Sequence, residues 1–163
     1  MLKTLHENIC DSYNRLLTLL RINTLAKCIG KKPIYINSRL HGYDMGLTSM
    51  HYEFKESDLN MLRESMTDLY DDLNDLRRHT PKDIGDNEEI VCQDMRRITS
   101  MLNMPAFCEA TGISHRDWNS RVNPNEKRYH LRQDHLEKMK AHLGTVLNLL
   151  LSEIENLNKI SAH

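Results

Sequence analysis

The chain has 163 residues and a formal net charge of −1, enough for one or two small domains with a hydrophobic core. Glycine and proline are few and aromatic residues make up 6% of the chain, which favours helix over sheet. No apolar run is long enough for a transmembrane helix, and no signal peptide is recognisable. We therefore expect an all-α, cytoplasmic protein with no membrane partner.

The first 80 residues predict two long helices with an ambiguous stretch between them. Apolar residues recur every three or four positions over residues 2–28, which indicates one helix that ends at Gly30 to Pro33. Residues 34–54 are ambiguous, because Ile34 and Ile36 alternate like a short strand while Gly42 and Gly46 mark turns. A second helix is predicted from about residue 58 to 79.

The polar segment 81–88 is the predicted domain boundary. Residues 1–80 form a helical region that could serve dimerisation or bind a protein partner. Residues 89–163 form a second domain that begins with a helix over about 89–102 and ends with a helix of about 29 residues, 132–160. The predicted fold thus combines long N- and C-terminal helices with the segment between residues 103 and 123.

Residues 103–123 predict two short helices joined by a tight turn at Gly112. Asn103 and Ser114 are good N-caps, and Pro105 is tolerated in a first helical turn. Gly112 suits the left-handed conformation that ends a helix. The residues that would pack the pair together are small or apolar: Phe107, Cys108, Ile113, Trp118 and Val122. This is the pattern of a helix-turn-helix.

The same positions, Phe107, Cys108, Gly112, Ile113, Ser114, Trp118 and Val122, resemble the lambda-repressor-type helix-turn-helix DNA-binding family. The resemblance covers about 21 residues. It implies that His115 and Arg116, the first two residues of the second helix, read base edges. It also implies that Ser120 and Asn123 contact bases or the backbone. Met104 and Trp118 depart from the family's usual Gln and Ile or Val at their positions.

Charge and polarity around this segment favour nucleic acid. The outward residues of the second helix are all hydrogen-bonding types: His115, Arg116, Asn119, Ser120 and Asn123. Lys127 and Arg128 follow in a loop and are predicted phosphate contacts. Residues 91–143 hold 9 Lys and Arg against 6 Asp and Glu, whereas residues 53–90 hold 5 against 12. Phosphate neutralisation supplies much of DNA affinity, so the local excess counts for more than the overall charge.

The last predicted helix has an unusually wide apolar face between residues 136 and 160, interrupted by Glu153. Such a face is either covered within the chain by the helices at 2–28 and 58–79, or forms a dimer interface, or does both in an intertwined dimer. A homodimer would also give two reading helices for two half-sites.

Catalytic and metal sites are not predicted, and no cofactor is expected. His135 and His142 lie seven residues apart, too far along a helix to share an ion. A buried structural thiol explains Cys108 better than a nucleophile paired with His115 does, and no phosphate loop or zinc spacing is present. The sequence therefore predicts a non-enzymatic, homodimeric transcriptional regulator, a bacterial or phage repressor that binds double-stranded DNA. The alternative is a helical protein-interaction or inhibitor module without DNA binding.

Overall fold

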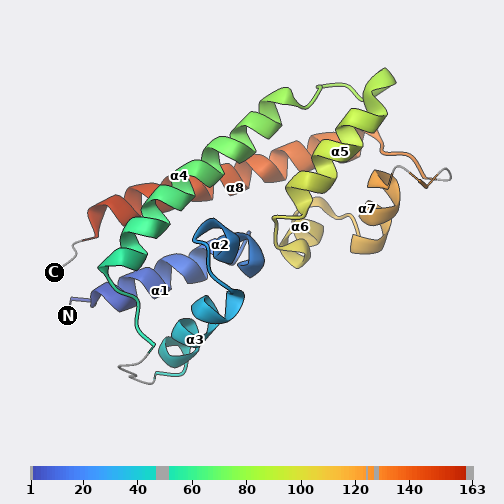
Figure 1. The fold of residues 1–163 in the computed structure, drawn as a ribbon. Coiled ribbons are helices and arrows are strands. Elements are labelled where there is room, and N and C mark those ends of the chain that lie inside the picture. The colour runs from blue at the N-terminus through green and yellow to red at the C-terminus, as the bar shows by residue number, and fades with distance from the viewer. Residues whose placement is uncertain (1, 47–51, 124, 127–128, 161–163) are drawn as a thin grey trace.

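Eight α-helices and one short 3-10 helix make up the described part of the computed structural model, which covers residues 2–46, 52–123, 125–126 and 129–160 (Figure 1). They are α1 (Leu5–Leu16), α2 (Ile22–Cys28), α3 (Pro33–Asp44), α4 (Glu56–His79), η1 (Gly85–Asn87), α5 (Glu88–Thr99), α6 (Met104–Thr111), α7 (His115–Val122) and α8 (Gln133–Lys159). These residues contain no β-strand, only an isolated bridge between Leu20 and Leu102. The prediction of an all-α fold is confirmed.

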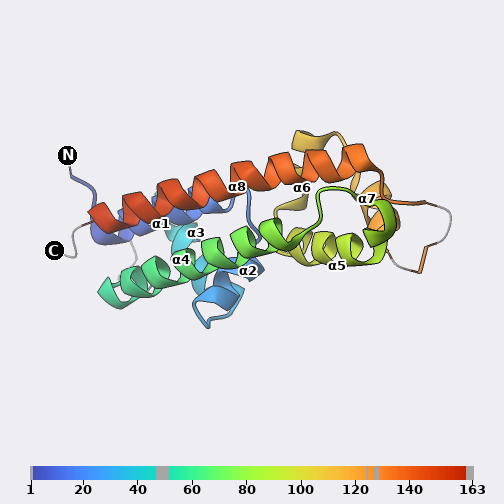
Figure 2. The ribbon, with the colours of Figure 1, turned by 90° about the horizontal axis from the view of Figure 1, so that it is seen from above.

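The long helices α4 and α8 run antiparallel side by side and form the axis of the molecule (Figures 1 and 2). The helix α1 packs along the C-terminal half of α8, and α6 packs against α8 nearer its start. The helix α7 lies at the opposite end from the two chain termini and packs on α5. One long helix therefore links the N-terminal helices to the α5–α7 unit.

The wide apolar face of the last helix is covered within the chain. Its buried apolar side chains are Leu136, Met139, Leu143, Val146, Leu147, Leu150 and Leu157. They meet a matching stripe on α4, formed by Leu59, Leu62, Met66, Leu69 and Leu73. Burying each such side chain contributes about 1.5–3 kcal/mol to stability. Among the arrangements left open by the sequence, the structure shows cover within the chain.

Glu153 interrupts that face and is nevertheless buried, because its charge is paired. One carboxylate oxygen accepts a hydrogen bond from Arg15 Nε at 2.7 Å, and the other accepts one from Ser12 Oγ at 2.9 Å. A buried carboxylate without such partners would be strongly destabilising. The acidic residue therefore joins α1 to α8.

The single helix predicted over residues 2–28 is wrong, because the chain breaks into α1 and α2. Backbone groups between them bond to the α5–α6 link instead of continuing the helix. Arg21 N donates to Met101 O at 3.1 Å, and Asn103 N donates to Leu19 O at 2.9 Å. We call residues 19–21 and 101–103 together the junction. These tertiary hydrogen bonds offset the loss of helical ones.

The short strand predicted at Ile34 and Ile36 is also wrong. Pro33 occupies the start of α3, where its missing N–H costs little. Ile36 and Leu40, four residues apart, are the buried side chains of this helix, while Ile34 is 66% exposed. The turn predicted at Gly46 is present with φ of 70°, and residues 47–51 lie outside the described part of the chain.

The predicted boundary segment 81–88 covers most of the connection between α4 and α5, with η1 inside it, and the first residue of α5. Ile84 is buried there, and its N–H donates to Gln133 Oε1 at 3.0 Å. Hydrophobic residues on both sides of this segment belong to one continuous core. The division into residues 1–80 and 89–163 remains a prediction.

Candidate nucleic-acid interface

The helices α6 and α7 begin and end where the sequence predicts, with side-chain caps at both starts. Asn103 Oδ1 accepts from Ala106 N at 3.2 Å, and Ser114 Oγ accepts from Asp117 N at 3.1 Å. Gly112 has φ of 72° and its N–H donates to Cys108 O at 2.9 Å. A side chain at this φ would be strained. The local chemistry thus produces two short helices joined by a tight turn, and the assignment of this pair as a DNA-binding helix-turn-helix remains a prediction.

Trp118 fixes α7 to the rest of the protein. Its ring is fully buried against Phe107, with centroids 5.0 Å apart, and its Nε1–H donates to Thr99 Oγ1 at 3.2 Å. Phe107 in turn forms a T-shaped contact with the His142 ring on α8. A chain of ring contacts therefore runs from α7 through α6 to α8. Such packing holds the outer face of α7 in one orientation.

The predicted reading residues all lie on α7 or directly after it. His115, Arg116, Asn119 and Asn123 are exposed, and Ser120 is half-buried. Asp117 and Arg121 face elsewhere and pair with each other, with Arg121 Nε 2.9 Å from Asp117 Oδ1. Lys127 and Arg128, the predicted phosphate contacts, lie outside the described residues. The exposed residues include a cation and neutral hydrogen-bonding groups.

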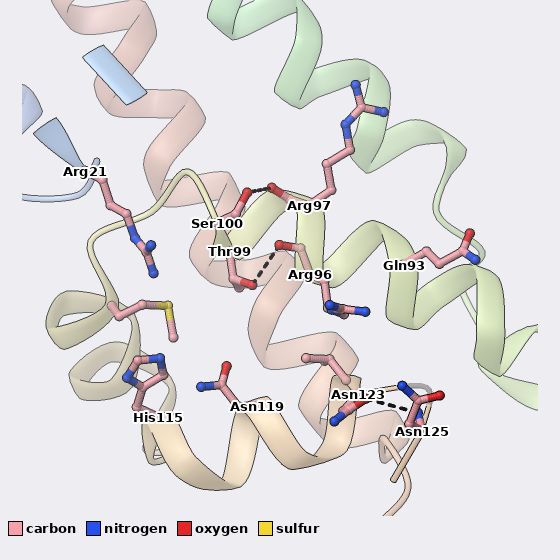
Figure 3. A pocket seen from close by; sticks show the side chains of 12 residues that line it. Arg21, Gln93, Arg96, Arg97, Thr99, Ser100, His115, Asn119, Asn123 and Asn125 are labelled. Carbon is pink, nitrogen blue, oxygen red and sulfur yellow. Dashed lines mark hydrogen bonds between the residues drawn. The ribbon is translucent and has the colours of Figure 1, made fainter. Parts of the chain in front are cut away.

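A hollow of about 800 Å³ lies between α5 and α7, and Figure 3 shows its lining. We call it the arginine hollow, because its polar lining includes three arginines along with amides and a histidine. These residues are Arg21, Gln93, Arg96, Arg97, His115, Asn119, Asn123 and Asn125. His115 and Asn119 lie on one stripe of α7, four residues apart, and Asn123 follows directly after the helix, while Arg116 and Ser120 lie beside that stripe and outside the hollow. The structure thus divides the predicted site residues into two neighbouring stripes.

The arginine hollow is an anion-attracting surface. None of the described residues that line it is Asp or Glu. Among the described residues, no carboxylate lies within salt-bridge distance of Arg21, Arg96 or Arg97. By contrast, the long helix α4, which precedes α5 in the chain, carries many exposed carboxylates. Unpaired cations that surround a hollow raise its local potential and attract negatively charged ligands.

Sequence reasoning missed the residues that α5 and the junction contribute to this surface. The pair Arg96 and Arg97 directly precedes the predicted helix-turn-helix within the basic segment, so its position was a usable signal. Arg21 gave none, because it lies about 80 residues away and inside what the sequence predicts as a continuous helix. The break between α1 and α2 brings Arg21 to the hollow.

The described residues give little support for a metal site, a reactive thiol or a membrane-spanning helix. No group of three or more His, Cys, Asp and Glu side chains there is placed to hold a metal ion. Burial raises the pKa of the Cys108 thiol, which disfavours the reactive thiolate. No helix found in those residues is long and apolar enough to cross a membrane.

Comparisons of the chain with protein-family models, curated proteins and solved structures gave no match.

Proposed function

We propose that this protein is a sequence-specific, double-stranded-DNA-binding transcriptional regulator, a cytoplasmic repressor of bacterial or phage origin. One observation supports this most: a capped helix, fixed by Trp118, exposes hydrogen-bonding residues beside an acid-free hollow lined by arginines. A major-groove reader needs a rigid helix with polar groups outward and cations alongside.

In the proposed complex, α7 enters the major groove. A helix with its side chains is about 10–12 Å across, which matches the width of the major groove, and the eight residues of α7 extend about 12 Å along it. Arg116 donates to the two major-groove acceptors of a guanine, and His115 reads a neighbouring base edge. Asn119, Ser120 and Asn123 supply the remaining hydrogen bonds to bases or backbone.

The proposed repressor acts as a homodimer, because one eight-residue helix reads only a few base pairs and two half-sites multiply affinity and specificity. The dimer surface is not the buried face of α8, since α1 and α4 already cover that face. Leu151 is the large apolar side chain of α8 that remains substantially exposed, at 47%. Assembly through the outer side of α8 would leave the core intact.

A second candidate function is protein binding through α4. Five exposed carboxylates lie on successive turns of this helix: Glu64, Asp68, Asp71, Asp72 and Asp75. A basic protein partner would complement them, whereas DNA would be repelled. Binding to duplex DNA distinguishes the two candidates.

The test is a selection from a random duplex library, followed by titration of the selected duplex. The wild-type protein should enrich a defined sequence. Arg116→Ala should weaken binding to that sequence by roughly 1–3 kcal/mol, because a bidentate base contact is lost. Arg78→Ala, which removes an exposed arginine of α4, is the matched control and should leave affinity unchanged. Absence of any enriched sequence would reject the regulator and favour the protein-binding module.

A further inference from the structure

We propose that the arginine hollow binds the phosphates of the DNA strand that borders the groove occupied by α7, with Arg96 of α5 and Arg21 of the junction as the contacts. This inference rests on the proposed function and adds to it a second element and a second region of the chain. It assigns the N-terminal helices a direct part in DNA binding.

The position of the arginine hollow beside α7 favours the binding of DNA phosphates there. The hollow begins on the α7 stripe of His115 and Asn119, immediately beside the outward stripe of Arg116 and Ser120. A helix that lies in the major groove has a phosphate backbone along each flank. The flank of α7 toward α5 is therefore where a strand would pass, and this flank is hollowed and carries cations.

Arg96 is available for such a contact. It is exposed in the last turn of α5, and no hydrogen bond or ion pair of its guanidinium occurs with the described residues. Figure 3 shows its side chain extending from α5 into the space between the two helices, on the side of Asn123. An arginine without an internal partner keeps all five donors for a phosphate.

Arg21 is available in part and is fixed in place. Its Nε donates to Leu102 O at 2.8 Å, and its backbone N donates to Met101 O. Thr24 Oγ1 also donates to Met101 O, at 2.8 Å. The terminal nitrogens of Arg21 point into the hollow toward His115 (Figure 3). The junction thus holds a charged group that is oriented before any ligand arrives, which lowers the entropic cost of binding.

Arg97 differs from its neighbour in a useful way. Its side chain points away from α7 in Figure 3, and it also lines a second hollow with Asp72 of α4. Removing it takes the same charge from the same helix turn without removing a group aimed at α7. Arg97→Ala is therefore a matched control for Arg96→Ala.

The experiment measures the salt dependence of binding to the selected duplex from the library selection. Each lost phosphate contact should reduce the slope of log affinity against log salt by about one unit. Between ~50 and ~200 mM salt, one contact accounts for roughly a 3.5-fold change in affinity. Arg96→Ala and Arg21→Gln should each show this loss with sequence preference kept, and Arg97→Ala should show a smaller one.

Arg21→Lys separates charge from scaffold. Lysine keeps the positive charge and removes the guanidinium Nε that bonds to Leu102 O. If Arg21 contacts a phosphate, Arg21→Lys restores the wild-type slope while Arg21→Gln does not. If Arg21 only holds the junction together, both variants lower the melting temperature and leave the slope unchanged, which overturns its assignment.

The outcomes separate this inference from the proposed function. Sequence-selective wild-type binding with unchanged slopes for Arg96→Ala and Arg21→Gln overturns the inference and leaves the regulator standing. A loss of sequence preference in these two variants, at constant slope, makes them base readers and also overturns it. Failure of the wild-type protein to bind any duplex at low salt removes both proposals.

Discussion

The helices α4 and α7 show two ways in which one chain fixes a helix and uses its outer face. The helix α4 has 24 residues and seven buried side chains, so its position depends on many contacts at once. The helix α7 has eight residues and buries only Trp118 and Val122. Isolated helices of that length are unstable in water. Its position therefore depends on one N-cap, Ser114, and on these two buried side chains.

The outer faces of α4 and α7 also differ, in the residue types that they expose. The exposed face of α4 is dominated by carboxylates, whereas α7 exposes amides, a histidine and an arginine beside the arginine hollow. A face with many interchangeable charges tolerates change, but a short face with few donors has a specific role at each position. The comparison predicts that single substitutions act globally through the α4–α8 pair and locally through α7.

The largest effect should come from Leu150→Glu, in the part of α8 that supports α1 and α4. Leu150 is fully buried, and an unpaired carboxylate there costs several kcal/mol of a total stability of about 5–15 kcal/mol. We expect this variant to lose cooperative folding, which circular dichroism during heating would detect.

The neighbouring substitution Leu151→Glu is the control, because Leu151 is 47% exposed. It should change the free energy of unfolding by no more than about 0.5 kcal/mol. Sedimentation of this folded variant also tests the outer side of α8 as the dimer surface. Equal destabilisation by the two substitutions would contradict the packing of α8 described above.

The second effect in size concerns Trp118→Ala, which removes the main anchor of α7. We expect a loss of roughly 3–5 kcal/mol in urea unfolding, from the cavity and the transfer of the ring to water. Trp118→Phe keeps most of the volume and loses the hydrogen bond to Thr99 Oγ1, so it should cost about 1 kcal/mol. A Trp118→Ala variant as stable as the Phe variant would show that α7 does not need its anchor.

The difference between the two helices also explains which features the sequence could predict. Local signals were sufficient for α6 and α7, because Asn103, Gly112 and Ser114 determine the helix ends by hydrogen bonds within a few residues. They were sufficient for most of α4 and α8, whose apolar stripes are long. They failed at the junction, where Leu19 and Arg21 bond to partners about 80 residues away.

The same limit applies to the candidate site. The exposed residues of α7 follow from helical periodicity, so His115 and Asn119 could be named from the sequence. Arg96 follows from its place just before the motif, although only the fold shows that it faces α7. Arg21 depends on a tertiary backbone pairing that no local pattern encodes. The predicted contacts Lys127 and Arg128 lie outside the described residues and stay predictions.

Acid should weaken the packing between α6 and α8 through His142. This ring is 5% exposed, its Nε2 has no hydrogen-bond partner among the described residues, and burial lowers its pKa. The His142 ring of the unfolded chain binds a proton near pH 6.5, and burial shifts this protonation to lower pH in the folded chain. Stability is therefore complete above pH 6.5 and falls as the pH drops below it.

Chemical unfolding at several pH values measures this effect. His142→Leu should flatten the dependence between pH 6.5 and the lowered folded-state pKa, with the remaining slope due to His6 and His135, whose pKa values are also lowered by burial. The difference between wild type and variant isolates His142. Parallel pH profiles for the two proteins would show that His142 is not titrated on unfolding.

The smallest effect, and the sharpest contrast between the two helices, concerns serines at their starts. Ser114 Oγ accepts from Asp117 N at the start of α7, whereas Ser57 in the first turn of α4 is exposed and makes no hydrogen bond with the described residues through its hydroxyl. Ser114→Ala should cost about 1 kcal/mol, the usual value of an N-cap, and Ser57→Ala should stay within about 0.5 kcal/mol. Because α7 has so few other contacts, the lost cap should also loosen its first turn, where His115 and Arg116 lie. Hydrogen exchange of the Asp117 amide reports this loosening directly, and DNA titration should show weaker binding with an unchanged salt slope. If Ser114→Ala and Ser57→Ala had equal effects on stability and exchange, α7 would be held as redundantly as α4.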